Sequence, residues 1–205
     1  MKKFLSALIT LISFVSVNAQ SKEKGTIEIT PKIGSSNFHQ YYNGDRFEFN
    51  LDSNSGVAFG ATADYYLNNR WSLRSGLVFN KMGFKYNFFV AREEKLNYLS
   101  IPLNANWHFG STRKWNLNFG FSPSFLLNAE LIDSEGNHIK IPKSDLKSFQ
   151  LGLTFGIGYK IEITKKFGIL LDYQFFEGLT NINKASSENI INAGGSLNVG
   201  GVIQL

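Results

Sequence analysis

The sequence predicts an all-β protein, an eight-stranded antiparallel up-and-down transmembrane β-barrel. Three observations predict this class: strand-like segments with two-residue alternation, connections that alternate between short and long, and an export signal at the N-terminus. The clearest alternation covers residues 115–125, where large apolar side chains at odd positions alternate with Asn, Gly and Ser, and only Pro123 interrupts the apolar series. A period of two over this length predicts a strand with one apolar and one polar face, long enough to cross a bilayer at a tilt.

The N-terminal segment has the features of a secretory signal peptide. Lys2 and Lys3 precede a largely apolar run from Phe4 to Val17, and Ala19 is a small residue at a plausible cleavage point. The run is shorter than the roughly 20 apolar residues that a spanning helix needs, and no stop-transfer segment follows it. We therefore expect residues 1–19 to be a signal peptide and residues 20–205 to form one barrel domain. The alternative is a buried N-terminal helix.

The composition limits both the partners and the kinds of structure expected for this protein. The formal net charge is +5, or +3 without Lys2 and Lys3, and so mild a balance does not indicate nucleic acid. There are no cysteines, which excludes a disulfide scaffold, a thiolate metal site and a lipid-modified N-terminal cysteine. No later segment has the apolar run of a spanning helix, so a closed barrel is the remaining structure that satisfies its backbone in lipid.

Eight segments carry the alternation that predicts a half-buried strand. The first places isoleucines at positions 27, 29 and 33 against Glu, Thr and Lys, and odd positions are apolar or aromatic throughout the second, fifth, sixth and seventh segments. The fourth contains Pro102, which lacks a ladder donor, so we expect a bulge there. In the last segment Val202 breaks the alternation. In chain order the segments are about Gly25–Ser36, Gly56–Leu67, Trp71–Phe84, Leu96–Phe109, Trp115–Leu127, Phe149–Ile161, Phe167–Phe175 and Ser196–Leu205.

The connections fall into two classes. Residues 68–70, 110–114 and 164–166 are short and polar, whereas the stretches near 37–55, 85–95, 129–146 and 177–190 are long. Outer-membrane barrels have short periplasmic turns and long extracellular loops. An even number of strands then places both termini on the periplasmic side.

Aromatic residues cluster beside the short turns, on the apolar face. A ring of this kind is typical of the aromatic girdle at a membrane interface, and the alternative is a set of scattered core aromatics. The residues are Trp71, Phe109, Trp115 and Phe167.

Periodicity alone does not say which face points inward. A soluble barrel of the lipocalin kind would put the apolar face inside. Here the polar face is rich in Gly, Ser, Thr and Asn with few Lys and Glu, and the apolar face has large residues at most positions. The interior of an eight-stranded barrel is narrow and suits small residues better than rows of Phe and Trp. We therefore expect lipid outside.

Charged residues on the polar face should find partners in the lumen. If 68–70 is a three-residue turn, Asp64 faces Arg74, and we expect an ion pair between them because an unpaired buried charge is costly. Lys160 and Asp172 could approach each other diagonally across another short hairpin.

Two motifs resemble the PorT-like outer-membrane β-barrel family of Bacteroidetes. They are Tyr98-Leu99-Ser100-Ile101-Pro102-Leu103 before an alternating strand, and the segment from Tyr173 to Ile182 with its Gly-Leu-Thr-Asn exit. The resemblance implies an eight-stranded barrel in the outer membrane. Some members of that family are linked to protein secretion. The chain departs from many outer-membrane barrels by ending in Leu205 and not in an aromatic residue.

No catalytic, cofactor or metal motif stands out. His39, Asp45 and Asp52 share the first long loop and would be the candidates for a rim enzyme acting on lipids or peptides, which is one alternative; a small channel is another. The same loop is rich in aromatics, and Tyr41, Tyr42 and Phe47 are candidate recognition residues unless they extend the strands and pack together. We expect a non-enzymatic barrel in contact with outer-membrane lipid, acting through its loops or through envelope or secretion proteins.

Overall fold

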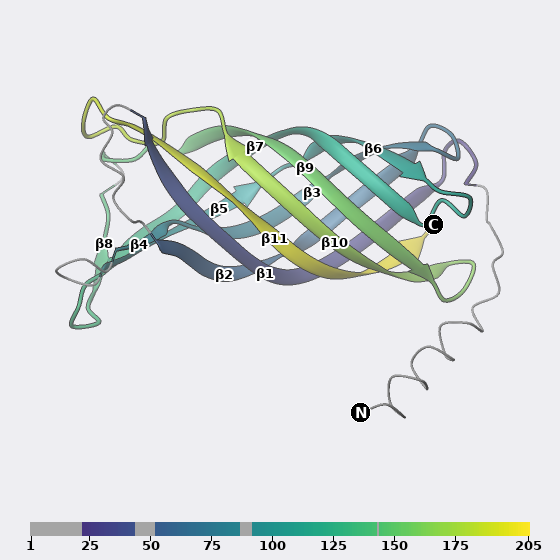
Figure 1. The fold of residues 1–205 in the computed structure, drawn as a ribbon, viewed down its shortest axis with the longest axis horizontal. Coiled ribbons are helices and arrows are strands. Elements are labelled where there is room, and N and C mark those ends of the chain that lie inside the picture. Colours follow the sequence, from purple (N-terminus) through teal and green to yellow (C-terminus); the bar gives the residue numbers. More distant parts are fainter. Residues whose placement is uncertain (1–21, 44–51, 87–91, 143) are drawn as a thin grey trace.

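Every strand of the barrel wall pairs antiparallel with its neighbours, and the last strand pairs back with the first (Figure 1). The structure is a computed structural model that describes residues 22–43, 52–86, 92–142 and 144–205. No helix in these ranges is long and apolar enough to cross a membrane. The strands are β1 (Ile27–Asn43), β2 (Asp52–Tyr66), β3 (Trp71–Met82), β4 (Phe84–Tyr86), β5 (Arg92–Ser100), β6 (Leu103–Phe109), β7 (Trp115–Ile132), β8 (His138–Lys140), β9 (Phe149–Glu162), β10 (Phe167–Gly178) and β11 (Asn189–Gln204).

The antiparallel all-β class expected from the sequence is confirmed, but the eight expected strands are not all continuous. β4 continues β3 beyond Gly83, whose φ of +121° suits glycine, and β6 continues β5 beyond Pro102. β8 forms a short hairpin on the end of β7 alone. The eleven strands therefore make eight spans of the closed wall, namely β1, β2, β3 with β4, β5 with β6, β7, β9, β10 and β11.

The bulge expected at Pro102 lies elsewhere. Leu99 pairs with Phe125 and Leu103 pairs with Phe121, so the register against β7 is the same on both sides of the proline. The register shifts farther up the wall, between Asn97 and Tyr98, where β7 carries one extra residue at Leu127. Pro102 therefore interrupts the ladder without displacing the strand.

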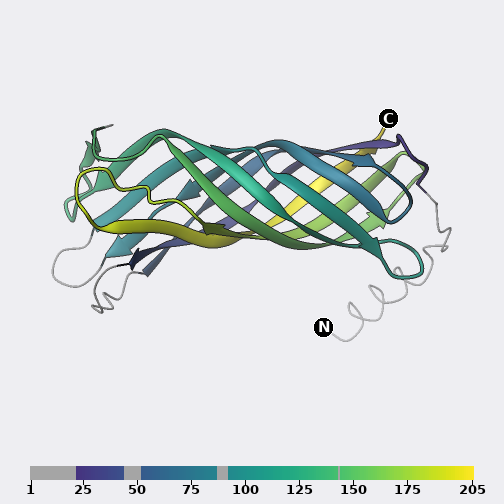
Figure 2. The same cartoon turned by 90° about the horizontal axis from the view of Figure 1, so that it is seen from above.

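The two ends of the barrel differ. The short turns lie at one end together with both ends of the described chain, where the amide of Leu205 donates to the carbonyl of Ile27 at 3.0 Å. β4, β8 and the long connections lie at the other end, and the strands wind between the two ends at a steep tilt (Figure 2). β1 continues to Asn43, so the first long connection is shorter than the expected 37–55.

The barrel has a polar interior and an apolar outer wall. Asn and Ser side chains at even positions are buried, whereas large apolar side chains at odd positions face outward, with Leu77 and Leu103 each 54% exposed. A soluble barrel would show the opposite arrangement. The sequence folds this way because alternate residues of a strand point to opposite faces, and only the small polar set fits the narrow lumen.

Candidate functional site: the closed lumen and its rims

A buried carboxylate gathers three donors at the short-turn end of the lumen. Glu28 accepts from Lys22 at 3.0 Å, from Lys160 at 2.9 Å and from the hydroxyl of Tyr66 at 2.9 Å. Lys22 also binds the side chain of Gln204. The side chain of Lys22 therefore ties the chain just before β1 to the last strand at this mouth of the barrel.

The structure brings Asp64 and Arg74 together in the hairpin register expected from the sequence. The two residues are direct partners across β2 and β3, and Nε of Arg74 lies 3.1 Å from Oδ2 of Asp64 with both side chains buried. Asp172 extends the network, with Oδ1 3.6 Å from Nη1 of Arg74 and Oδ2 3.1 Å from Nζ of Lys32. Each charge in this group therefore has an opposite charge in contact, as burial requires.

Lys160 and Asp172 do not pair, which corrects the expectation from the hairpin. Asp172 lies opposite Gly158 and Lys160 lies opposite Leu170, and both side chains instead bind residues of β1, on the other side of β11. Closure of the sheet pairs β11 with β1, which brings the carboxylate of Glu28 within 2.9 Å of the Lys160 ammonium. The choice of partner is thus set by the closed barrel and not by the local hairpin.

Ser72 contacts both Asp64 and His108, but the geometry is not that of a nucleophile and its base. The hydroxyl of Ser72 lies 2.9 Å from Oδ1 of Asp64 and 2.9 Å from Nε2 of His108. An ionised carboxylate only accepts, so the single hydroxyl proton goes to Asp64 and Nε2 of His108 must be the donor. A histidine that donates to the serine cannot remove its proton, so this group is a structural network.

A small cavity with both polar and apolar lining residues lies in the middle of the lumen. Its volume of about 50 Å³ is large enough for a few water molecules. Phe38 and Phe176 border it toward the long-loop end. Its polar lining includes Thr62, Asn80, Asn104, Thr154, Gln174 and Ser196.

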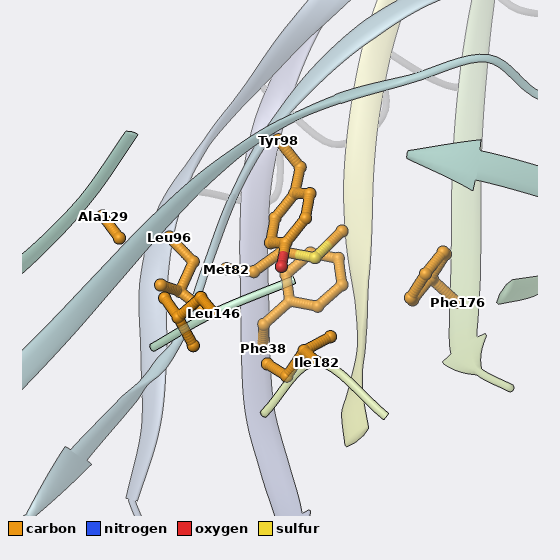
Figure 3. Packing of buried hydrophobic residues seen from close by; sticks show 8 residues of the cluster. All are labelled: Phe38, Met82, Leu96, Tyr98, Ala129, Leu146, Phe176 and Ile182. Carbon is orange, nitrogen blue, oxygen red and sulfur yellow. The ribbon is translucent and has the colours of Figure 1, made fainter. Parts of the chain in front are cut away.

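A cluster of buried apolar side chains, called the plug, lies inside the barrel toward the long-loop end (Figure 3). Two of its members come from connections and not from the wall: Leu146 precedes β9 and Ile182 follows β10. The two connections are tied by the amide of Lys147, which donates to the carbonyl of Ile182 at 2.8 Å. Ile182 is fully buried, so these connections are folded into the mouth of the barrel. The plug consists of Phe38, Met82, Leu96, Tyr98, Ala129, Leu146, Phe176 and Ile182.

The aromatics beside the short turns form a stacked row around part of the outer wall. Trp71 stacks on Trp107 at 6.3 Å between ring centroids, and Phe109 lies 6.2 Å from Trp115. Trp107 joins these two pairs, because its ring lies 5.1 Å from that of Phe109. Phe167 faces outward at the same end, beside the turn that joins β9 and β10. The alternation in the sequence places Trp107 on the same apolar face as Phe109, but Trp107 was not among the four residues expected to form the aromatic girdle.

The structure describes only some of the residues that the sequence suggested for loop recognition or rim chemistry. Tyr41 lies on β1 and not in a loop; it is exposed, and its ring lies 4.6 Å from that of His39. The side chain of Tyr42, the whole of Phe47 and Asp45, and the side chain of Asp52 lie outside the described residues.

The histidines do not form a site in the described ranges. His138 lies on β8, where Nδ1 is 3.1 Å from Glu130, away from His39 on β1. These ranges contain no cluster of three His, Cys, Asp or Glu side chains that could hold a metal ion.

Solved structures similar to this chain are membrane barrels. OprG from Pseudomonas aeruginosa has a TM-score of 0.52 at 10% identity, with 89% of this chain and 97% of that chain covered. The N-terminal β-barrel domain of Pseudomonas aeruginosa OprF has a TM-score of 0.50 at 15% identity, covering 91% and 100%. AlkL, solved in lipid bilayers, has a TM-score of 0.51 at 9% identity, covering 91% and 93%. At these identities the likeness shows the fold alone.

Sequence comparison gives the family. No curated protein sequence matches this chain. Residues 18–184 match the family described as outer membrane protein beta-barrel domain, at a level that does not single out PorT-like proteins. Together with the apolar outer wall and the polar lumen, this match shows that the chain belongs to the outer-membrane β-barrel domain family and that its barrel lies in the outer membrane.

Proposed function

We propose that this protein is a closed, non-enzymatic barrel that acts through its long-loop end, which faces the cell exterior. The observation that carries the proposal is the apolar plug, because Leu146 and Ile182 fold two connections into the mouth. Side chains that occupy the lumen block the path that a transported solute would take. The resemblance to PorT-like proteins favours contact with envelope proteins that serve secretion.

The two alternatives have less support. A channel needs a continuous wetted path, whereas here apolar side chains lie above a cavity of about 50 Å³ and an ion network lies below it. A rim enzyme needs a base with access to substrate. His39 contacts Tyr41, and His108 is held as a donor inside the wall.

Conductance separates the closed barrel from the channel. We expect the purified full chain in a planar lipid bilayer to give no open-channel steps, with a porin in the same bilayer as the positive control. Replacing both Leu146 and Ile182 by serine removes the apolar part of the closure and should add at most brief openings, because the network around Arg74 stays in place. Long-lived steps from the unmodified protein would favour the channel.

Site-specific photo-crosslinking in cells tests the interaction role. A crosslinking residue in place of Tyr41, exposed on the long-loop part of β1, should give adducts with protein. The matched control is Leu77 in the middle of the outer wall, where we expect lipid contact and no protein adduct. Protein adducts at neither position would contradict a role through this end of β1.

A further inference from the structure

Three lysines surround one carboxylate on the outer wall near the long-loop end. Nζ of Lys81 lies 3.1 Å from Oε1 of Glu93, and Nζ of Lys95 lies 3.8 Å from the same oxygen. Lys85 is the direct cross-strand partner of Glu93 between β4 and β5. Lys85 is also the cross-strand partner of Asp52 on β2, so the register gives the three lysines two carboxylate partners, Glu93 and Asp52. This leaves one more positive than negative charge at this point.

A further acid, Glu130, lies nearby between a lysine of this group and a lysine outside it. Glu130 faces Lys95 across β5 and β7, and it also faces Lys140 from the short strand β8. Its carboxylate is 3.1 Å from the ring of His138. Lys140 offsets the charge of Glu130, so the positive excess at the three lysines remains.

The lysine cluster, defined as Lys81, Lys85 and Lys95, borders the lipid-facing surface. On β5 the side chains of Leu96 and Tyr98 are fully buried in the barrel, so Lys95 and Glu93 alternate to the outside. On β3, Lys81 follows the outward sequence of Leu77 and Phe79. The cluster thus begins where the apolar wall ends, at the depth of lipid headgroups.

Lys81 is held in place along the wall. A Cβ on Gly56 would lie 2.7 Å from Cβ and 2.9 Å from Cδ of Lys81, so the lysine stem packs where only glycine leaves room. Its side chain is 22% exposed, and that of Lys95 is 24% exposed. The apolar stems are covered while the ammonium groups converge on one oxygen, which is how lysines behave at a membrane interface.

We infer that the lysine cluster binds the phosphate groups of an anionic membrane lipid. Phosphate offers several acceptor oxygens and more charge than a carboxylate, so it can engage all three ammonium groups, with Glu93 marking the position at which an oxygen fits. The position favours lipid over a soluble anion, because the apolar wall directly below receives acyl chains. The inference does not depend on which side of the membrane the long-loop end faces.

Native mass spectrometry of the folded full chain in neutral detergent tests the inference. The probes are diphosphorylated lipid A, the same lipid after removal of its phosphates, and inorganic phosphate. We expect the protein to bind the diphosphorylated lipid about tenfold or more tightly than the dephosphorylated lipid. The double variant Lys81→Gln/Lys95→Gln should lose about tenfold or more of that affinity, since each lysine at an anionic surface contributes about fivefold.

The matched control is Lys165→Gln/Lys166→Gln, which removes two exposed lysines from the opposite end of the barrel. It should keep the affinity of the unmodified protein. Equal losses in both double variants would show unspecific charge attraction and overturn the site. Inorganic phosphate that displaces the lipid at equal concentration would assign the cluster to a soluble anion and overturn the lipid inference. Heat-modifiability of each variant on gels confirms that the barrel is folded before binding is compared.

Discussion

Replacing Asp64 by alanine is expected to lower the free energy of unfolding by about 3–5 kcal/mol, the usual cost of removing one partner from a buried ion pair. Asp64 is 2% exposed and accepts hydrogen bonds from Arg74, Ser72 and Asn106. Alanine leaves the guanidinium with only the more distant Asp172 and leaves two polar donors without their acceptor. Urea unfolding in lipid vesicles, followed by the heat-modifiable gel band, measures the change.

Three controls isolate the ion pair. Asp64→Asn keeps an acceptor oxygen and should cost less than alanine, and Glu23→Ala removes an exposed carboxylate and should change stability by less than about 0.5 kcal/mol. The double variant Asp64→Ala/Arg74→Met completes a cycle, and it should be more stable than Asp64→Ala alone because no uncompensated charge remains. A cost below about 1 kcal/mol for Asp64→Ala would contradict a buried pair.

Placing an arginine at Leu77 is expected to cost about 2–4 kcal/mol, because this position faces lipid near the middle of the wall. Leu77 is 54% exposed and lies between Trp71 at one edge of the apolar wall and Lys81 at the other. The matched control is Leu67→Arg, an outward leucine beside a short turn. There the guanidinium reaches the interface, and the cost should be about 0–1 kcal/mol.

The same urea titration measures both arginine variants, so the comparison does not depend on absolute stability. Equal effects at the two positions would show that depth in the membrane does not matter. That outcome would argue against lipid contact along this face.

The hairpin contacts were predictable because a short turn fixes the register of its two strands. Residues 68–70 join β2 and β3, so Asp64 had to face Arg74 once the turn was recognised. Two-residue alternation likewise separated the outward leucines and aromatics from the inward Asn and Ser. These inferences use only neighbours in sequence.

Contacts between strands that are far apart in the sequence were not predictable in the same way. Lys160 binds Glu28, which is 132 residues earlier in the chain, and the pairing exists only because β11 closes on β1. The sequence offered both residues as charges on polar faces, but it did not say which strands would face each other. Choosing Glu28 over Asp172 as the partner of Lys160 requires the strand pairing of the closed barrel.

The plug was missed because its two inserted residues belong to connections without periodicity. Nothing near Leu146 or Ile182 distinguishes a connection that folds inward from one that extends outward. The first connection shows the reverse case. Phe38 was assigned to a loop, but β1 continues past it and buries its ring in the plug. In both places, the space that remains in the long-loop mouth of the barrel decides whether a side chain is buried.

Tryptophan fluorescence tests the central claim, that the apolar face of this barrel lies in lipid. All three tryptophans of the chain, Trp71, Trp107 and Trp115, belong to the stacked outer row near the short turns. In vesicles, we expect strong quenching by lipids brominated near the headgroup end of the acyl chains, weaker quenching by lipids brominated near the chain ends, and little by acrylamide in the water. Strong quenching by acrylamide with none by either brominated lipid would place this face in water and contradict the account.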